Sequence, residues 1–336
     1  MSLSNIFSKK ILLTFFIFVL IIFFSYFLIG FYIAYNILKI DHSCGAHQGS
    51  LPNTWDTSLD IQNYKINKSI QLRKDFDSKK YHLNKWQEVN FSSNEKNINI
   101  SGWLFNYYKN RPIVIIVHGI FPNGKCKPES NLIASLLIKN QINALTIDLR
   151  NYGESTFVNK YENLGLTSYK DVLGAYEFLL RNGFEENEIG LLGISLGATS
   201  TIFAAKSNTK IKAVWVDSSI SEFKLILKDE IARYGFSHDF GLAVSFAGKI
   251  LSGIDPYNLS PAFSLTKEQN YFFTHGEKDL RVLPHHFQYL KQYSKENKIK
   301  ADFWLVPDAY HVDSILMFPE EYGFKMKNFF ETHLTN

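Results

Sequence analysis

The chain has 336 residues and a net charge of +4, with 46% apolar and 20% charged residues. This composition provides a large core, and no block of Lys and Arg forms the footprint that nucleic-acid binding needs, so we expect no nucleic-acid partner. The two cysteines, Cys44 and Cys126, are too few for a disulfide scaffold and lack the CxxC spacing of a structural zinc site. Whether they pair stays open, because sequence does not fix their geometry.

The N-terminal region predicts one transmembrane anchor. Residues 11–38 contain no charged side chain, and a stretch of about 20 apolar residues crosses a bilayer. No small-residue cleavage pattern follows, which favours an uncleaved anchor over a signal peptide. Lys9 and Lys10 precede the span, whereas Asp41 offsets Lys39 after it. The positive-inside rule then predicts that residues 1–10 are cytoplasmic and that the rest of the chain is outside.

The remainder divides into a linker and one large domain. Residues 39–85 are polar and weakly periodic, which predicts a linker or stalk. Residues 86–335 begin with two alternating stretches, WQEVNFSS and INISGWLF, that predict a β-hairpin. PIVIIVHG (112–119) is a continuous apolar run typical of a strand buried on both faces. Further strands alternate with helices, which predicts an α/β fold with a mostly parallel central sheet and helices on both faces.

A candidate nucleophile lies between a predicted strand and a predicted helix. Gly193-Ile194-Ser195-Leu196-Gly197 matches G-x-S-x-G, with the apolar run EIGLLGI before it and the small-residue stretch ATSTIFAAKS after it. Strand, sharp turn and helix in this order are the setting of a nucleophile elbow, in which the glycines avoid collisions with neighbouring backbone. The alternative is a glycine-rich turn with a serine cap.

The chain order of the fold then selects a base and an acid. His311 follows the last predicted strand and precedes the last helix, the position of the general base. Asp279, in THGEKDLRV after the preceding strand, is the expected orienting acid, and Asp217, one strand earlier, is the alternative. Among the other histidines, His285 and His286 are predicted on a solvated helix face.

Two backbone N–H groups are expected to form an oxyanion hole. Leu196 follows the nucleophile, and Ile120 lies in the loop after PIVIIV, with Phe121 as the alternative donor there. His118 comes too early in the chain to be the base, so we expect it to hold this loop by hydrogen bonds.

These motifs together resemble a bacterial, membrane-anchored serine hydrolase of the α/β-hydrolase superfamily, in the group called serine aminopeptidase-like or dienelactone-hydrolase-like. The matching segments span about three quarters of the chain: ISGWLF, IVHG, DLRNYGES (148–155), GISLGA (193–198), THGEKDLRV (274–282) and the His311 loop. The resemblance implies that Asp148, Arg150 and Gly153 are structural. Tyr310 stands where relatives often have Gly before the histidine.

Residues 221–264 interrupt the predicted sheet where this fold carries a cap over its site, either a packed helix pair or a mobile lid. The resulting prediction is a hydrolase that cleaves a carboxylic ester or related acyl compound through an acyl-enzyme, with no metal or organic cofactor. A peptidase or amidase with the same three residues is the first alternative, and a non-catalytic binding protein is the second. The natural acyl group and the oligomeric state stay open, because a fold does not specify them.

Overall fold

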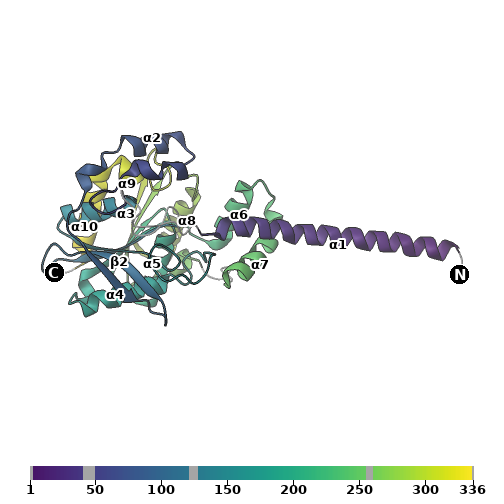
Figure 1. The fold of residues 1–336 in the computed structure, drawn as a ribbon, viewed down its shortest axis with the longest axis horizontal. Coiled ribbons are helices and arrows are strands. Elements are labelled where there is room, and N and C mark those ends of the chain that lie inside the picture. Colours follow the sequence, from purple (N-terminus) through teal and green to yellow (C-terminus); the bar gives the residue numbers. More distant parts are fainter. Residues whose placement is uncertain (1–2, 41–49, 121–127, 255–259, 335–336) are drawn as a thin grey trace.

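The structure is a computed structural model that describes residues 3–40, 50–120, 128–254 and 260–334. A twisted sheet flanked by helices forms the body, and a long N-terminal helix, α1 (Leu3–Leu38), projects from it (Figure 1). Cys44, Cys126 and Phe121 lie outside the described residues.

In the part of the chain that the structure describes, eight strands form one sheet in the order β1-β2-β4-β3-β5-β6-β7-β8. β1 and β2 pair antiparallel as the predicted hairpin, β2 pairs antiparallel with β4, and every other pairing is parallel. The mostly parallel sheet predicted from the sequence is therefore confirmed. The strands are β1 (Gln87–Ser92), β2 (Asn99–Phe105), β3 (Ile113–Val117), β4 (Asn143–Ile147), β5 (Ile189–Ile194), β6 (Ala213–Asp217), β7 (Asn270–Gly276) and β8 (Lys300–Val306).

Helices cover both faces of this sheet, which explains why every side chain of β3 is buried. α4, α5 and α8 pack on one face and share one apolar cluster with the strands. α3, α9 and α10 pack on the other face in a second cluster. The bounds are α3 (Pro128–Lys139), α4 (Tyr169–Arg181), α5 (Leu196–Ser207), α8 (His285–Asn297), α9 (Ser314–Met317) and α10 (Pro319–His333).

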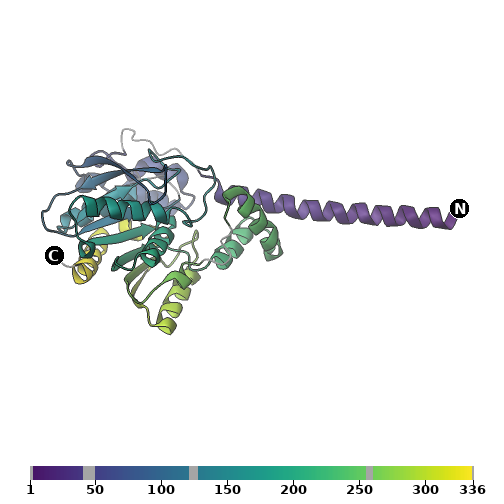
Figure 2. The same cartoon turned by 90° about the horizontal axis from the view of Figure 1, so that it is seen from below.

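Two helices inserted between β6 and β7 form a cap, within the range expected for it. They are α6 (Phe223–Arg233) and α7 (Gly241–Ser252), joined through a 3-10 turn, η4 (His238–Phe240). Figures 1 and 2 both show them beside the end of α1 that is nearer the sheet. The packing is close: a Cβ added to Gly30 of α1 would lie 2.5 Å from the Cβ of Ala243.

The expectation of a linker or stalk over residues 39–85 is wrong for residues 50–85. These residues form η1 (Thr57–Asn63), α2 (Asn67–Asp75) and η2 (Ser78–Tyr81). Trp55 is buried, and it belongs to the apolar cluster that contains α3 and α10. The segment lacks apolar periodicity because a few large side chains, rather than a regular stripe, attach it to the domain.

Candidate active site

Ser195 lies at a strained turn between β5 and α5. Its backbone has φ 54° and ψ −111°, a conformation that non-glycine residues rarely adopt. A Cβ on Gly193 would lie 2.3 Å from the carbonyl oxygen of Gly197, and one on Gly197 would lie 2.1 Å from that of Val117. Only glycine fits at these two positions, so the turn has the close backbone contacts expected of a nucleophile elbow.

Three of the predicted residues meet at the carboxyl edge of the sheet. His311 Nε2 lies 3.2 Å from Ser195 Oγ, and His311 Nδ1 lies 2.7 Å from Asp279 Oδ2. The three side chains follow β5, β7 and β8, whose parallel direction brings their carboxyl ends to one edge. In this arrangement the Asp279 carboxylate accepts the Nδ1–H of His311 and leaves Nε2 free to accept the proton of Ser195.

The surroundings of Asp279 favour its charged form. The carboxylate is fully buried and accepts the backbone N–H groups of Arg281 at 2.7 Å and Val282 at 2.9 Å. Burial raises the pKa of Asp279, but the charge and hydrogen bond of His311, followed by the charge of His275 and the Val282 N–H, outweigh burial and hold this pKa below its ordinary value. Asp279 is therefore suited to stabilise a protonated imidazole.

Asp217, the alternative acid, makes different contacts. It accepts hydrogen bonds from the hydroxyls of Tyr322, at 2.7 Å, and Ser218, at 2.8 Å. Burial raises the pKa of Asp217 to about 6, although these hydroxyl bonds lower it. The ring of His311 is hydrogen-bonded to Asp279 instead, so the geometry favours Asp279 as the partner of the histidine.

Both expected oxyanion-hole residues lie at the same cavity as Ser195. Ile120 and Leu196 line it, one from the loop after β3 and the other from the first turn of α5. His118 holds the base of that loop: Leu149 N–H donates to its Nε2 at 3.1 Å, and its Nδ1–H donates to Gly119 O at 2.6 Å. This matches the hydrogen-bonding role expected of His118 from its place in the chain.

A buried ionic network supports the loop that carries His311, and no local sequence pattern indicates it. Arg73 of α2 contacts Asp313 at 2.6 Å and Glu129 of α3 at 2.9 Å, with all three side chains at most 2% exposed. The Arg73 guanidinium also lies 3.6 Å from the ring centroid of Tyr64. Asp313 is two residues after His311, so this network fixes the loop close to the base.

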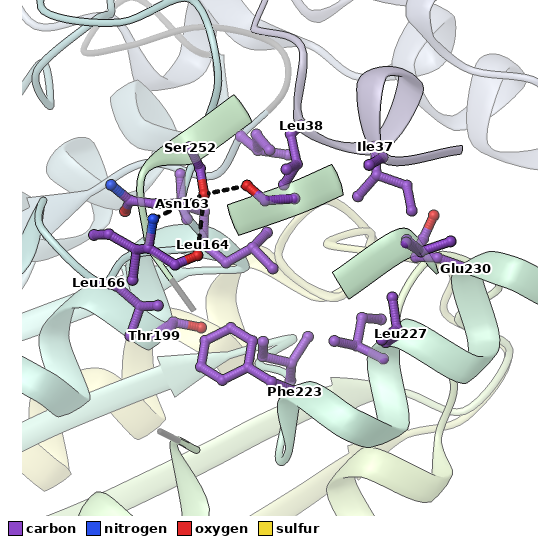
Figure 3. A pocket seen from close by; sticks show the side chains of 18 of the residues that line it. Ile37, Leu38, Asn163, Leu164, Leu166, Thr199, Phe223, Leu227, Glu230 and Ser252 are labelled. Atoms are coloured by element: carbon purple, nitrogen blue, oxygen red, sulfur yellow. Dashed lines mark hydrogen bonds between the residues drawn. The ribbon is translucent and has the colours of Figure 1, made fainter. Parts of the chain in front are cut away.

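The cavity next to Ser195 is mainly apolar, and part of its wall comes from α1. Figure 3 shows Ile37 and Leu38 of α1 together with Phe223 and Leu227 of the cap helix α6 around it. Sequence patterns did not indicate this contribution, because an apolar helix next to a cavity has the same composition as one in lipid. The lining also includes Ala34 of α1 and Val244, Gly248 and Ser252 of α7.

One group among the described residues could present three metal ligands, namely Asp229, His285 and His286. The Ser221 N–H donates to His286 Nδ1 at 3.0 Å, so the neutral ring carries its proton on Nε2, which donates to Asp229 at 3.1 Å. A nitrogen that donates its proton cannot also ligate a metal. The hydrogen bonds therefore favour a structural role, in which these side chains link α6 to α8, over a metal site. The prediction of a solvated face is wrong for His286, which is fully buried.

Residues 112–259 match the sequence model of the alpha/beta hydrolase fold. No curated protein matches the chain. Among solved structures, the esterase Pf2001 of Pyrococcus furiosus is 21% identical, with 75% of this chain and 92% of that chain covered and a TM-score of 0.61. The acylaminoacyl peptidase of Pyrococcus horikoshii is also 21% identical, over 74% of this chain and 41% of that chain, with a TM-score of 0.58.

Likeness at this level of identity establishes the fold, and the sheet order and the sequence match agree with it. The chain therefore has the α/β-hydrolase fold, and its residues 112–259 resemble that family in sequence.

Proposed function

We propose that this chain is a serine hydrolase that cleaves a carboxylic ester through an acyl-enzyme. The observation that carries the proposal is the position of His311, whose two ring nitrogens are within hydrogen-bond distance of Ser195 and Asp279. A serine hydroxyl is a weak nucleophile until a base removes its proton, and this geometry supplies that base together with the group that orients it.

The reaction follows from the positions of these groups. Ser195 Oγ attacks the acyl carbonyl carbon while His311 Nε2 takes the hydroxyl proton, and Asp279 stabilises the imidazolium. The N–H groups of Ile120 and Leu196 are the proposed donors to the oxyanion. His311 then gives the proton to the leaving oxygen as the ester C–O bond breaks, and water releases the acyl group by the same steps.

The apolar cavity favours an ester of an apolar acid over a peptide. Its lining around Ser195 is largely aliphatic, which suits an acyl chain better than a polar peptide backbone. A peptidase or amidase with the same residues is the alternative, and neighbours of both types have this fold. A non-catalytic binding protein would have no need for a charged carboxylate that is hydrogen-bonded to a histidine which in turn contacts a serine hydroxyl.

A substrate panel separates these alternatives. We expect the purified full-length protein to hydrolyse p-nitrophenyl esters faster than aminoacyl anilides, and Ser195→Ala to lower kcat by about a millionfold with the fold intact. Faster cleavage of the anilides than of the esters would show that the protein is a peptidase or amidase and not an esterase. Substantial activity in Ser195→Ala would exclude Ser195 as the nucleophile.

We also propose that α1 is a retained membrane anchor with the hydrolase domain outside the cytoplasm. Residues Lys10–Leu38 are long and apolar enough to cross a bilayer, a test that signal sequences also pass. Retention is supported by the packing of the end of α1 into the cap, since cleavage would remove part of the cavity wall. The protein should resist carbonate extraction, and a C-terminal phosphatase fusion should be active only outside. A mature N-terminus beyond Leu38 would contradict retention.

A further inference from the structure

The segment of α1 from Tyr26 to its end at Leu38 is packed against the cap and the domain body. Tyr26 donates its hydroxyl to the carbonyl of Asp239 at 2.8 Å, and Phe27 lies with its ring centroid 5.3 Å from that of Phe246. At the helix end, Glu162 N–H donates to Leu38 O at 2.7 Å. The end of the proposed anchor therefore has a fixed position relative to Ser195.

Bilayer thickness places part of this contact at membrane depth. At 1.5 Å per residue, a hydrocarbon layer of about 30 Å takes about 20 residues, which run from Ile11 to Gly30. Residues 11–25 are exposed, whereas Tyr26, Phe27 and Gly30 already contact the cap. The cap segment beside them, from Asp239 to Phe246, must therefore reach the edge of the hydrocarbon layer.

The outer surface of α7 has the apolar character that this depth requires. Leu242, Phe246 and Ile250 are 74%, 51% and 55% exposed, and their spacing of four residues places them on one side of the helix. A water-facing helix would carry polar residues there. This stripe is continuous in space with α1 through the contact between Phe246 and Phe27, so lipid is the occupant that fits it.

The same helix also lines the cavity at Ser195. Val244, Gly248 and Ser252 of α7 face the cavity, alongside Ala34 and Ile37 of α1. A single helix thus lies between the exposed apolar stripe and the nucleophile. An apolar chain in the bilayer beside α1 and α7 is separated from the cavity by the width of that helix alone.

We propose that the membrane itself supplies the substrate, a long-chain fatty-acyl ester of a lipid, whose acyl chain enters the cavity from the bilayer alongside α1 and α7. This proposal rests on the serine-hydrolase function proposed above. Attack of Ser195 Oγ on the ester carbonyl breaks the bond to the lipid alcohol, which leaves with the proton carried by His311. Water then breaks the acyl-Ser195 bond, and the products are a fatty acid and the deacylated lipid.

Chain length provides the first test, with full-length protein and p-nitrophenyl acetate, butyrate, octanoate and palmitate in detergent. We expect kcat/KM to rise roughly fourfold for each CH₂ group that enters the cavity.

Ile37→Trp and Gly248→Leu fill the cavity from two different helices, and each should lower the palmitate-to-butyrate ratio of kcat/KM by at least about tenfold. A Cβ added at Gly248 would lie 3.6 Å from its nearest neighbour, the side chain of Leu38, so α7 has room for the first atom of the new side chain. Leu28→Trp, at a position 68% exposed on α1, is the matched control and should leave the ratio unchanged.

The source of the substrate is tested with phosphatidylglycerol carrying palmitoyl and oleoyl chains. The protein reconstituted in vesicles of this lipid should release fatty acid, and Leu242→Glu should lower release from vesicles more than release of the same lipid in detergent. Hydrolysis of butyrate but not of palmitate or the vesicle lipid would overturn the membrane-lipid proposal and leave the serine hydrolase standing. An unchanged chain-length ratio in both cavity variants would also overturn it. Failure to hydrolyse any ester would remove the proposed function, and this proposal with it.

Discussion

The ends of β6 and β7 carry two buried aspartates with opposite properties. The two strands are neighbours in the sheet, and Asp217 and Asp279 are 1% and 0% exposed. Burial is the largest influence on both and raises the pKa of each. The pKa of Asp217 remains raised, at about 6, whereas that of Asp279 ends below its ordinary value.

The difference comes from what donates to each carboxylate. Asp279 receives two backbone N–H groups from the turn after β7 and faces the ring of His311, which stabilises its charge when protonated. Asp217 receives two neutral hydroxyls. Hydrogen bonds from neutral hydroxyls offset the cost of burying a charge less well than N–H dipoles and a cation. A place at the end of a parallel strand is therefore insufficient to define the orienting acid.

The largest effect is expected when each of the two carboxyl groups is neutralised in turn. Asp279→Asn should lower kcat/KM roughly ten-thousandfold near neutral pH, because an amide favours the wrong tautomer of His311. Asp217→Asn should lose little activity, since the ring is bonded elsewhere. The measurement is kcat/KM for both purified variants, with circular dichroism to check the fold. An inactive Asp217→Asn beside an active Asp279→Asn would move the acid one strand earlier.

The second test removes the support of the His311 loop. Arg73→Met leaves Glu129 and Asp313 buried without their cation, which should lower the free energy of unfolding by about 3–5 kcal/mol. If Arg73 also positions His311 against Asp279, kcat should fall at constant KM in the folded protein, and Arg73→Lys should recover part of it. Arg181→Met, which removes an exposed pair with Glu177, is the matched control. Full kcat in folded Arg73→Met would limit Arg73 to a role in stability.

The different pKa of Asp217 should also change how the stability of the protein depends on pH. The pKa of Asp217 is raised from 3.8 to about 6, so the native state holds a proton that the unfolded chain releases. Stability is therefore lost as the pH rises through this window, by about 3 kcal/mol in total, and is constant above it. Asp217→Asn should flatten the stability curve between pH ~4 and ~6. Denaturant titrations across this range measure the slope, and equal slopes in both proteins would contradict the assigned pKa.

Local signals were enough to predict the fold and to single out the three residues that lie together at the candidate site. Ser195 lies between a continuous apolar strand and a helix of small residues, and both glycines of the motif are required by contacts within the turn. Asp279 and His311 follow strands that the apolar pattern also identifies. Each of these signals lies within a few residues of the feature it predicts.

Features that depend on distant contacts were missed. Arg73 and Asp313 are 240 positions apart, so neither side chain indicates the other in the sequence. His286 has the spacing of an exposed helix position, but Asp229 of the cap helix α6 is hydrogen-bonded to it. The contribution of α1 to the cavity was missed for a related reason, since Ile37 would be equally suitable in lipid. Tertiary packing decides these positions, and local periodicity does not describe it.

Ser195 is the proposed nucleophile of a serine hydrolase, and covalent labelling can test this assignment. Full-length protein should react with a fluorophosphonate at a single serine, and mass spectrometry should map the adduct to the peptide that contains Ser195. Ser195→Ala should remain unlabelled, and Asp279→Asn should be labelled far more slowly than Asp217→Asn, because the orienting acid is lost. Equal labelling of wild type and Ser195→Ala, or an adduct on another serine, would contradict the account.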